Sequence, residues 1–596
     1  MSVNDAALPR WDMTPIFPSL ESNEFSAALA SALSDLDALT ALFDKYAVRK
    51  RETDAVNAEF AAAYDAVTVP LNSLLETMRL LGSYIGCFTT VDANDETAKA
   101  AESKLDMDYV RLSHLITRYV AWVGASDVEE LKRKSELAAS NAYALTKAQY
   151  QARHQMSEAE ESLAAELGAS GISGWAKLHG NLTALLTAKV EINGEVQTLP
   201  MSEIRSLANN PDRAIRKAAY DAEMIAWATV TVPLAAALNG VKGYQQTVRK
   251  RRGYANDVEP TLLSNGIDRP TLDAMQTACV EAFPDFRRYM ALKAKALGVE
   301  KLAWHDLLAP LGETSRRYAW PEAEDVIRTN FRAFSNRMAD FADTSFREKW
   351  IDAEPRFGKE GGAYCTGMRP GESRVFMNFD GSANGVSTLA HELGHAYHNL
   401  NLKDRSPLQR STPMTLAETA SLFCETLVAE AEMQKASAAE KLTLLDRALQ
   451  GSCQIVVDIH SRFLFEQSVF DLRSQRDLSA AEFSEKMLAA QKATYGEDME
   501  SYHDKMWAVK GHYYGPLFYN YPYTFGALFT ISLYNVYKQN PESFRARYDD
   551  FLSSTGLADA PTLAKNFGLD ITDLEFWRGG LNVIRGQIDD FEQLVK

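Results

Sequence analysis

Two histidines four residues apart are the first residues of this chain whose spacing suggests chemistry. His391 and His395 lie in the stretch HELGHAYH (391–398), and Glu392 directly follows the first of them. Positions i and i+4 of an α-helix share one face, about 6 Å apart along the axis, so both imidazoles can bind one metal ion. Glu392 then lies beside the ion, where a carboxylate can accept a proton from metal-bound water. Imidazole and carboxylate ligands favour Zn²⁺, and the pattern predicts one zinc ion per chain.

A catalytic zinc site of this kind needs a third protein ligand and an open position for water. His398 shares the helix face but lies about 10 Å from His391 along the axis, too far for one continuous helix to bring all three imidazoles to one ion. We therefore interpret His398 as a residue that supports the fold or the site. A carboxylate on the helix after Pro413 is better placed, and Glu418 is the predicted third ligand. Glu425, two turns later, is either an acceptor for an imidazole N–H or a solvent-facing charge.

Most of the elements that must position these residues are helical. Apolar residues recur with helical spacing through 23–47, 53–90 and 96–124, and again from Gly385 almost to the end of the chain. Two exceptions are extended. Alternating runs flank Asn193-Gly194 and predict a hairpin, and RVFMNFDG (374–381) predicts a strand with GGAYC (361–365) as its neighbour. The pattern therefore predicts a mainly α fold with a small β-sheet next to the HExxH helix.

The chain length predicts more than one lobe. With 596 residues the chain exceeds one ordinary core. The helical pattern changes near the predicted hairpin, and the expected division is an N-terminal helical lobe of residues 1–200 and a catalytic lobe of residues 201–596 that carries the zinc motif.

Charge and cysteine usage restrict partners and compartment. The chain carries 63 basic and 80 acidic residues, a net charge of −17, which argues against nucleic-acid and anionic-membrane partners. The chain contains no run of 18 or more apolar residues, so we expect no membrane-spanning helix. The N-terminus lacks the pattern of a signal peptide, so none is expected. The five cysteines are dispersed and form no CxxC pair, which argues against disulfides and predicts a cytoplasmic protein.

A second stretch is rich in tyrosine. GHYYGPLFYNYPYTFG (511–526) holds five tyrosines, with prolines and glycines that favour an irregular loop. Buried tyrosine hydroxyls need partners, so packing alone rarely calls for so many. We interpret the stretch as a loop that offers hydroxyl and imidazole donors to a bound substrate, with an aromatic loop packed on the core as the alternative.

These motifs resemble those of the thimet oligopeptidase family of zinc metallopeptidases, and its oligoendopeptidase F branch in particular. VSTLAHELGHAYH (386–398), Glu418, the tyrosine stretch, NPDRAIRKAA (210–219) and RWDMTPIFPSLESNEF (10–25) carry the resemblance. It implies two helical lobes around a deep substrate channel with zinc on its floor. It also implies endopeptidase activity on short, unstructured oligopeptides, by Glu-assisted attack of zinc-bound water.

In that family, a histidine and tyrosines of the matching loop face the scissile carbonyl. The resemblance therefore implies catalytic roles for His512, Tyr519 and Tyr523 beside Glu392. The spacing within this loop varies in the wider family, and Gly526 stands where a further tyrosine sometimes occurs. The strand RVFMNFDG and its neighbour GGAYC are candidates to pair with an extended substrate backbone.

Two other functions compete with this interpretation. A zinc carboxypeptidase of similar helical fold would need a fixed cation for the terminal carboxylate, and Arg369 and Arg374 are available. A non-catalytic, metal-stabilised peptide-binding protein would usually close its metal site with four protein ligands. Cleavage preference and oligomeric state are left open by the sequence.

Overall fold

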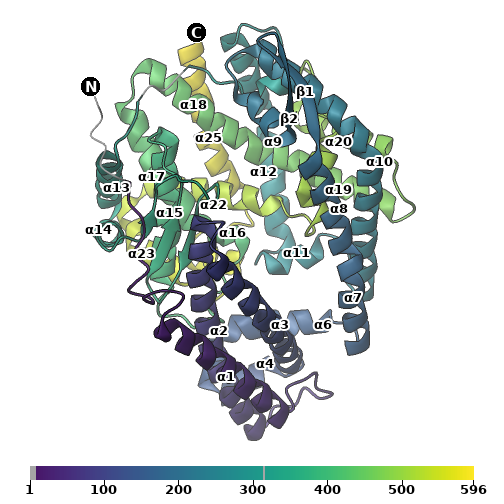
Figure 1. Cartoon of the computed structure of the whole chain (residues 1–596), viewed down its shortest axis with the longest axis vertical. Coiled ribbons are helices and arrows are strands. Elements are labelled where there is room, and N and C mark those ends of the chain that lie inside the picture. Colours follow the sequence, from purple (N-terminus) through teal and green to yellow (C-terminus); the bar gives the residue numbers. More distant parts are fainter. Residues whose placement is uncertain (1–7, 313–315) are drawn as a thin grey trace. The chain divides into compact units, whose positions relative to one another are not determined.

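The computed structural model describes residues 8–312 and 316–596, and helices make up most of them (Figure 1). The predicted absence of a signal peptide concerns a stretch that includes residues 1–7, which lie outside the described residues. Several helices begin at a serine, asparagine or aspartate whose side chain accepts a hydrogen bond from a backbone N–H three residues later, as at Ser22, Asn57 and Asp95. These caps satisfy N–H groups that lack a partner in the first helical turn. The mainly α fold class is confirmed.

Two compact units divide the chain, and each is assembled from three stretches. The first unit takes the described residues of Met1–Gln155, Arg316–Glu432 and Val536–Gly568, and the second takes those of Met156–Ser315, Met433–Asn535 and Leu569–Lys596. The boundaries of these units are not those of a single division at residue 200. The predicted domains 1–200 and 201–596, and the channel between lobes, stay predictions.

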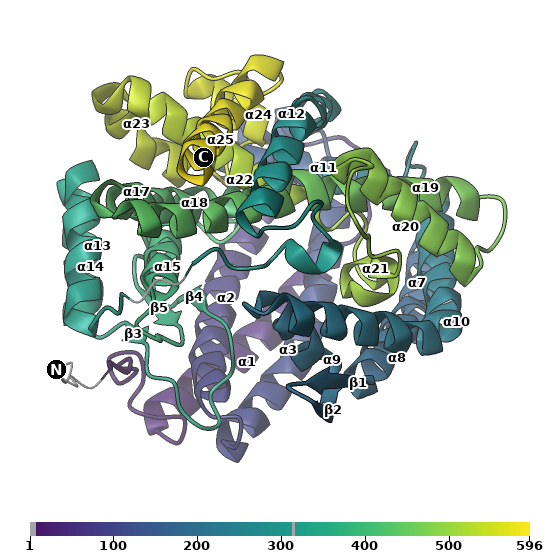
Figure 2. The same ribbon diagram turned by 90° about the horizontal axis from the view of Figure 1, so that it is seen from above.

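The first unit combines thirteen helices with a small sheet among its described residues. The elements are α1 (Asn23–Lys45), α2 (Ala58–Val91), α3 (Glu96–Gly124), α4 (Val128–Lys134), α5 (Glu136–Ser140), α6 (Ala142–Arg153), α13 (Trp320–Phe334), α14 (Asn336–Arg347), β3 (Ile351–Asp352), β4 (Tyr364–Gly367), β5 (Ser373–Phe376), α15 (Ala383–Asn401), α16 (Met414–Ala417), α17 (Thr419–Lys435), α23 (Pro541–Ser553) and α24 (Ala560–Asn566). Figures 1 and 2 show α1, α2 and α3 side by side, and their buried leucines and aromatic residues form most of one core.

The second unit contains the hairpin and the remaining described helices. The elements are α7 (Glu158–Ser170), α8 (Ile172–Leu185), β1 (Thr187–Ile192), β2 (Glu195–Pro200), α9 (Met201–Ser206), the 3₁₀ helix η1 (Leu207–Asn209), α10 (Arg213–Arg251), α11 (Glu259–Ser264), α12 (Arg269–Ala296), the 3₁₀ helix η2 (Trp304–Asp306), α18 (Ala438–Cys453), the π-helix η3 (Gln454–Asp458), α19 (Ile459–Arg473), α20 (Ala480–Tyr495), α21 (Met506–Val509), the 3₁₀ helix η4 (Gly511–Tyr514), α22 (Tyr521–Gln539) and α25 (Leu574–Val595). Its own core lies among α10, α19 and α20.

Both predicted β regions form strands, but in the second region β5 ends at Phe376, well before residue 381, and β4 begins only at Tyr364. Strands β1 and β2 pair antiparallel around Asn193 and Gly194, whose φ angles of 54° and 83° are those that a tight hairpin turn requires. The second sheet has the order β3-β5-β4, with β5 parallel to β3 and antiparallel to β4. Both β4 and β5 contact α15, so the small sheet does lie next to the HExxH helix.

Strand β4 is an edge strand, whereas β5 is central. The N–H of Met368 donates to the carbonyl of Glu372, which makes these residues a hydrogen-bonded pair at the end of the β4–β5 ladder. Hydrogen-bonded and non-hydrogen-bonded pairs alternate in antiparallel sheets. Cys365 and Gly367 therefore turn their backbone N–H and C=O groups away from β5. Of the two candidate substrate strands, only GGAYC, which continues into β4, has an unpaired edge.

Two helices, α1 and α10, are long and apolar enough to cross a membrane when judged by length and composition alone. Core helices of soluble proteins pass the same test, and part of each helix is buried in the structure. The absence of a membrane-spanning helix therefore stays a prediction.

Candidate active site

Helix α15 carries the HExxH motif and begins earlier than the motif requires. Its N-cap is Ser382, whose side chain accepts a hydrogen bond from the Gly385 N–H. Ser387 lies one turn inside the helix, and its hydroxyl donates to Glu425 Oε1 at 2.9 Å. The helix then continues through Asn401, which keeps the two motif histidines on one straight stretch of backbone.

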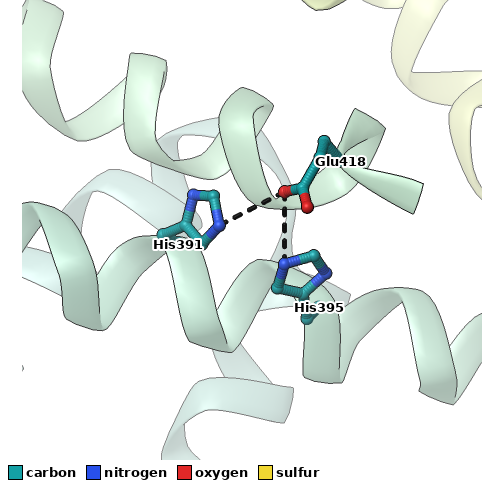
Figure 3. A group of neighbouring side chains, drawn as sticks. All are labelled: His391, His395 and Glu418. Atoms are coloured by element: carbon teal, nitrogen blue, oxygen red, sulfur yellow. Dashed lines mark ion pairs between the residues drawn. The ribbon is translucent and has the colours of Figure 1, made fainter. Parts of the chain in front are cut away.

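His391, His395 and Glu418 converge on one point, as Figure 3 shows. The Nε2 atoms of both histidines lie 3.3 Å from Glu418 Oε2, and the candidate ligand atoms all lie within 4.8 Å of one another. Two imidazoles and a carboxylate in this arrangement match the donor set that zinc prefers. The structure thus brings together the three residues that the sequence predicts as ligands, although ligation itself stays a prediction.

Glu418 reaches this point from a break between two helices. It is the C-terminal cap of α16, with φ −89° and ψ 1°, and α17 starts at the next residue. The Ser421 hydroxyl donates to Glu418 Oε2 at 2.7 Å. Burial raises the pKa of Glu418, but the hydrogen bonds from the two histidines outweigh burial and hold the pKa well below its usual range. The side chain is therefore a charged ligand donor at neutral pH.

Glu425 binds the ring nitrogen of His391 that faces away from Glu418. Its Oε2 lies 3.1 Å from His391 Nδ1, and because a carboxylate can only accept, Nδ1 donates. Burial lowers the pKa of His391, but the hydrogen bonds to Glu418 and Glu425 raise it to about 10. With Nδ1–H engaged, Nε2 is the nitrogen left to face the cluster, which is the usual arrangement behind a metal-binding histidine. This contact favours the acceptor interpretation of Glu425.

Glu392 is buried beside the cluster with an oxygen that has no partner. Only 5% of its surface is exposed, and Oε2 has no hydrogen-bond partner within the described residues. Burial raises the pKa of Glu392, and the neighbouring His391 and His395 charges oppose that rise. A buried carboxylate oxygen without a donor is costly, and a water or polar ligand at the cluster would satisfy it.

His398 lies apart from the converging atoms. It is buried, its Nε2 lies 2.8 Å from the Thr555 hydroxyl, and burial lowers its pKa to about 4. Within the described residues, it is absent from the group that could hold a metal. These contacts agree with the interpretation of His398 as a residue that supports the fold.

Gly394, between the motif histidines, allows the ligand helices to approach closely. A Cβ built there would lie 2.5 Å from Ser421 Cα and 2.6 Å from the Ala420 carbonyl oxygen. Backbone atoms cannot move aside as a flexible side chain would. The spacing between α15 and α17 therefore depends on the absence of a side chain at this position.

Replacement of Gly394 by alanine is expected to force α15 and α17 apart. Overpacking in a core typically costs about 1–3 kcal/mol of unfolding free energy, and the shift would also displace Glu418 from the histidines. Thermal unfolding and metal content measure the two effects. Gly86→Ala in α2 is the matched control, because a Cβ there meets nothing within 4 Å and alanine should slightly stabilise the helix. An equally stable Gly394→Ala with unchanged metal content would contradict the expectation.

The tyrosine stretch belongs to the second unit and is more helical than expected. It passes through η4 and enters α22 at Tyr521, with Phe518 between them at φ 45°. Tyr513, Tyr514 and Tyr521 are fully buried, so the core-packing alternative holds for them.

His512, Tyr519 and Tyr523 retain accessible surface. The Tyr523 hydroxyl donates to the Tyr519 hydroxyl at 3.1 Å, and the His512 and Tyr519 rings lie 4.9 Å apart. Burial thus separates the three predicted catalytic residues of this stretch from its packing tyrosines. Their roles toward a substrate stay predictions.

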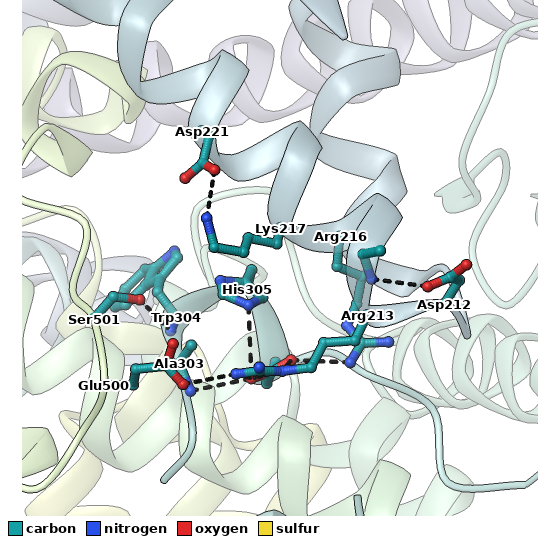
Figure 4. A network of polar contacts seen from close by, with 12 residues as sticks. Asp212, Arg213, Arg216, Lys217, Asp221, Ala303, Trp304, His305, Glu500 and Ser501 are labelled. Carbon is teal, nitrogen blue, oxygen red and sulfur yellow. Dashed lines mark hydrogen bonds and ion pairs between the residues drawn. The ribbon is translucent and has the colours of Figure 1, made fainter. Parts of the chain in front are cut away.

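A partly buried ionic network anchors the chain that leads into this stretch (Figure 4). Arg213 and Arg216, at the start of α10, both donate to Asp306, which is fully buried. Arg213 also pairs with Glu500 at 2.7 Å, and the Trp304 N–H donates to the Ser501 hydroxyl at 3.1 Å. Burial raises the pKa of Asp306, but the two arginines outweigh it and lower the pKa. The network joins α10, η2 and the segment before α21.

Sequence reasoning missed several residues that position the candidate site. The Ser421 hydroxyl donates to the proposed ligand Glu418, and the Ser387 hydroxyl donates to Glu425. Asn520 contacts His512 directly, and Arg462 donates to Asn520. The (i, i+3) spacing of Glu418 and Ser421 is the only local signal among these contacts. Asn520 and His512 lie eight residues apart without a regular spacing, and the Ser387–Glu425 and Arg462–Asn520 contacts join residues 38 and 58 positions apart.

An HExxH helix with a glutamate that converges on its two histidines is typical of zinc peptidases. The model of peptidase family M3 matches residues 206–582, so the chain belongs to this family. A protein named oligoendopeptidase F homolog from Lactococcus lactis subsp. lactis is 22% identical over 98% of this chain and 97% of its own length. The group B oligopeptidase PepB of Streptococcus agalactiae is 25% identical over 74% of each chain.

Solved structures share the fold over nearly the whole chain. A protein from Chlamydophila abortus has a TM-score of 0.84 at 20% identity and covers 98% of both chains. Oligoendopeptidase-F from Enterococcus faecium has a TM-score of 0.68 at 16% identity and covers 96% of this chain and 99% of its own. The resemblance drawn from the motifs is thereby confirmed at the level of the family and the fold.

Proposed function

We propose that this M3 peptidase is a zinc-dependent endopeptidase that hydrolyses short, unstructured oligopeptides. The observation that carries the proposal is the convergence of His391, His395 and Glu418 beside a buried, unpartnered Glu392 oxygen. The relatives named oligoendopeptidase F and oligopeptidase support the substrate class. The match to the family model, over residues 206–582, includes both the motif helix and the tyrosine stretch.

His391, His395 and Glu418 would hold the zinc ion, with Glu425 orienting His391. When bound, zinc supplies Lewis acidity, which polarises a carbonyl and makes a water ligand more acidic. Glu392 takes a proton from the attacking water and passes it to the leaving amine, as a general base and then a general acid. The charges of His391, His395 and Glu418 all act on the pKa of Glu392, so its carboxylate lies near the proposed ligands.

The edge of β4 would bind the peptide backbone. Gly367 is already engaged, since its carbonyl accepts a hydrogen bond from Arg79 Nη1 at 2.6 Å. Cys365 keeps its outward N–H and C=O groups for an added strand. Burial, and secondarily the nearby Glu392 carboxylate, raises the pKa of the Cys365 thiol, so the residue that would pair with the peptide lies close to the proposed base.

The carboxypeptidase alternative is less well supported. It needs a cation available for a terminal carboxylate, but Arg374 is fully buried and donates to the Asp12 carbonyl at 2.9 Å. Arg369 donates to the Ile16 carbonyl at 3.0 Å. Both candidate guanidinium groups therefore already bind backbone oxygens. A purely structural metal site would give no reason to bury Glu392 without a partner.

Mass spectrometry of products from an N-acylated, C-amidated peptide tests the proposal. An endopeptidase cuts this peptide internally, a chelator stops cleavage, and added zinc restores it. A compact folded protein should be cut far more slowly than the peptide. Failure to cut the blocked peptide, with release of single C-terminal residues from an unblocked one, would instead support the carboxypeptidase.

Tyr519→Phe or Tyr523→Phe is expected to lower kcat by roughly 10²-fold, because donors aimed at the charge developing on the carbonyl oxygen contribute about 2.7–4 kcal/mol each. KM and zinc content should change little, since the interaction forms mainly in the transition state. Steady-state kinetics measures both constants.

The matched control is Tyr143→Phe, which removes a hydroxyl in the first unit, far along the chain from the tyrosine stretch. If both loop variants turn over at nearly the wild-type rate, the oxyanion partner lies elsewhere and the stretch is structural.

We also propose a cytoplasmic location. All five cysteines are free, and Cys87, Cys279, Cys424 and Cys453 are buried. Thiols of this kind are typical of reducing compartments. Cell fractionation with detection of the chain tests the location.

A further inference from the structure

Buried polar residues connect His512 to the interior of the second unit. Arg462 pairs with Asp458, and its Nη1 donates to Asn520 Oδ1 at 2.9 Å. The same Asn520 oxygen lies 2.8 Å from His512 Nδ1. Arg462 is 5% and Asn520 is 4% exposed, whereas His512 is exposed. A series of buried polar contacts, from Asp458 through Arg462 and Asn520, thus ends at the predicted catalytic side chain of His512.

These contacts determine which nitrogen of His512 carries the proton. A guanidinium only donates, so the atom of the Asn520 amide that faces Arg462 must be the oxygen. Turning the amide over would point its NH₂ group at the guanidinium. Because the same oxygen faces His512, the Nδ1 atom must donate to it. The assignment follows from the chemistry of the partners rather than from the placement of hydrogens.

The charges around His512 favour its neutral form. Burial lowers its pKa, and Arg462 and Lys510 lower it further, against opposing effects of the Asn520 hydrogen bond and of Glu466. The ring of Tyr519 packs against the imidazole of His512, with 4.9 Å between the ring centroids. The net shift is downward, so the ring is neutral at neutral pH. A neutral imidazole with Nδ1–H has a lone pair on Nε2 and can only accept there.

We propose that Asn520, held by Arg462, is a positioning residue that keeps His512 in its neutral Nδ1–H form, so that Nε2 accepts a hydrogen bond from a peptide N–H of the substrate. This rests on the proposed function, in which His512 faces a bound peptide. It also revises the role expected from the sequence, where His512 is a donor to the carbonyl. Donation to the carbonyl then falls to Tyr519 and Tyr523.

The tautomer can be measured without any activity. ¹⁵N NMR of the zinc-loaded chain with labelled imidazoles, and a His512→Asn spectrum to identify the signal among ten histidines, reports which nitrogen is protonated. A protonated Nδ1 and an unprotonated Nε2 are expected at pH 7.5. A protonated Nε2 at that pH overturns the inference, whether or not the chain is an endopeptidase.

Asn520→Asp tests the contact with the peptide. Aspartate keeps the acceptor but adds a negative charge, which favours the imidazolium and should raise the pKa of His512 by about 1 unit or more. Below that raised pKa the ring is charged and Nε2 donates, so the contact is lost. Above it the ring is neutral and the contact returns. The acid limb of the kcat/KM profile should therefore move to higher pH, with a loss of roughly 10-fold at pH 7.

Asn520→Leu is the matched control because it removes the acceptor without adding charge. It should raise KM at all pH values, since either nitrogen is then free to carry the proton. The acid limb should not move to higher pH, because the lost Asn520 hydrogen bond had raised the pKa of His512. An acid limb that stays in place in Asn520→Asp overturns the proposed contact with the peptide. Failure of the proposed function would appear separately, as a wild-type chain that does not cut the blocked peptide with zinc.

Discussion

Glu392→Gln is expected to keep its zinc and to lose about 10²–10⁴-fold in kcat, the range typical of a lost general acid–base group. Glutamine preserves the size and polarity of the side chain but cannot take a proton. Glu392 lies beside the ligand atoms rather than among them, so zinc should remain. Its buried Oε2 without a partner is the atom positioned to receive the proton. Metal analysis and steady-state kinetics on the same preparation measure the two quantities.

Glu430→Gln is the control for that substitution. Glu430 lies on α17 in the same unit and pairs with Lys538 at 3.7 Å, so the variant removes a carboxylate outside the cluster. It should retain wild-type kinetics and metal. Substantial turnover by pure Glu392→Gln enzyme would remove Glu392 as the base, and loss of zinc would make it a ligand.

His391→Ala or His395→Ala is expected to remove zinc and activity together. Each Nε2 atom lies 3.3 Å from Glu418 Oε2, so either deletion leaves two protein ligands, too few for a zinc site of this kind. Glu418→Ala should reduce zinc occupancy and rate to a lesser degree, because both imidazoles remain. Zinc per chain after dialysis, together with peptide cleavage before and after added zinc, measures the effect.

His398→Ala is the matched histidine control. It deletes a buried imidazole that contacts Thr555, so it should lower the unfolding temperature and leave zinc in place. Loss of zinc in His398→Ala with full retention in Glu418→Ala would make His398 the third ligand. That outcome would overturn the assignment based on the convergence of His391, His395 and Glu418.

The local parts of the site are those that the sequence predicts well. The spacing of His391 and His395 places both on one face of a helix, because the helical repeat is a property of the backbone alone. The Asn193-Gly194 turn is similar, since those residues tolerate the positive φ angles that the hairpin requires. The small sheet before the motif is also predicted, although its order, with β5 central and β4 at the edge, is not.

Contacts between distant segments required the tertiary structure. Each unit is assembled from three stretches of chain, and no linear boundary describes such an arrangement. Which tyrosines of the 511–526 stretch are buried depends on the helices that cover them. The link from Arg462 to Asn520 spans 58 residues, and neither residue type suggests it alone.

The sequence by itself determined the helix that presents two imidazoles and a carboxylate, and it identified the family. The tertiary structure decided that Glu418 reaches those imidazoles and that His398 does not. It also decided which nitrogen of His512 carries the proton. The reason is that helix geometry is set by neighbouring residues, whereas convergence depends on how closely whole helices pack. At Gly394 that packing leaves no room for a single methyl group between α15 and α17.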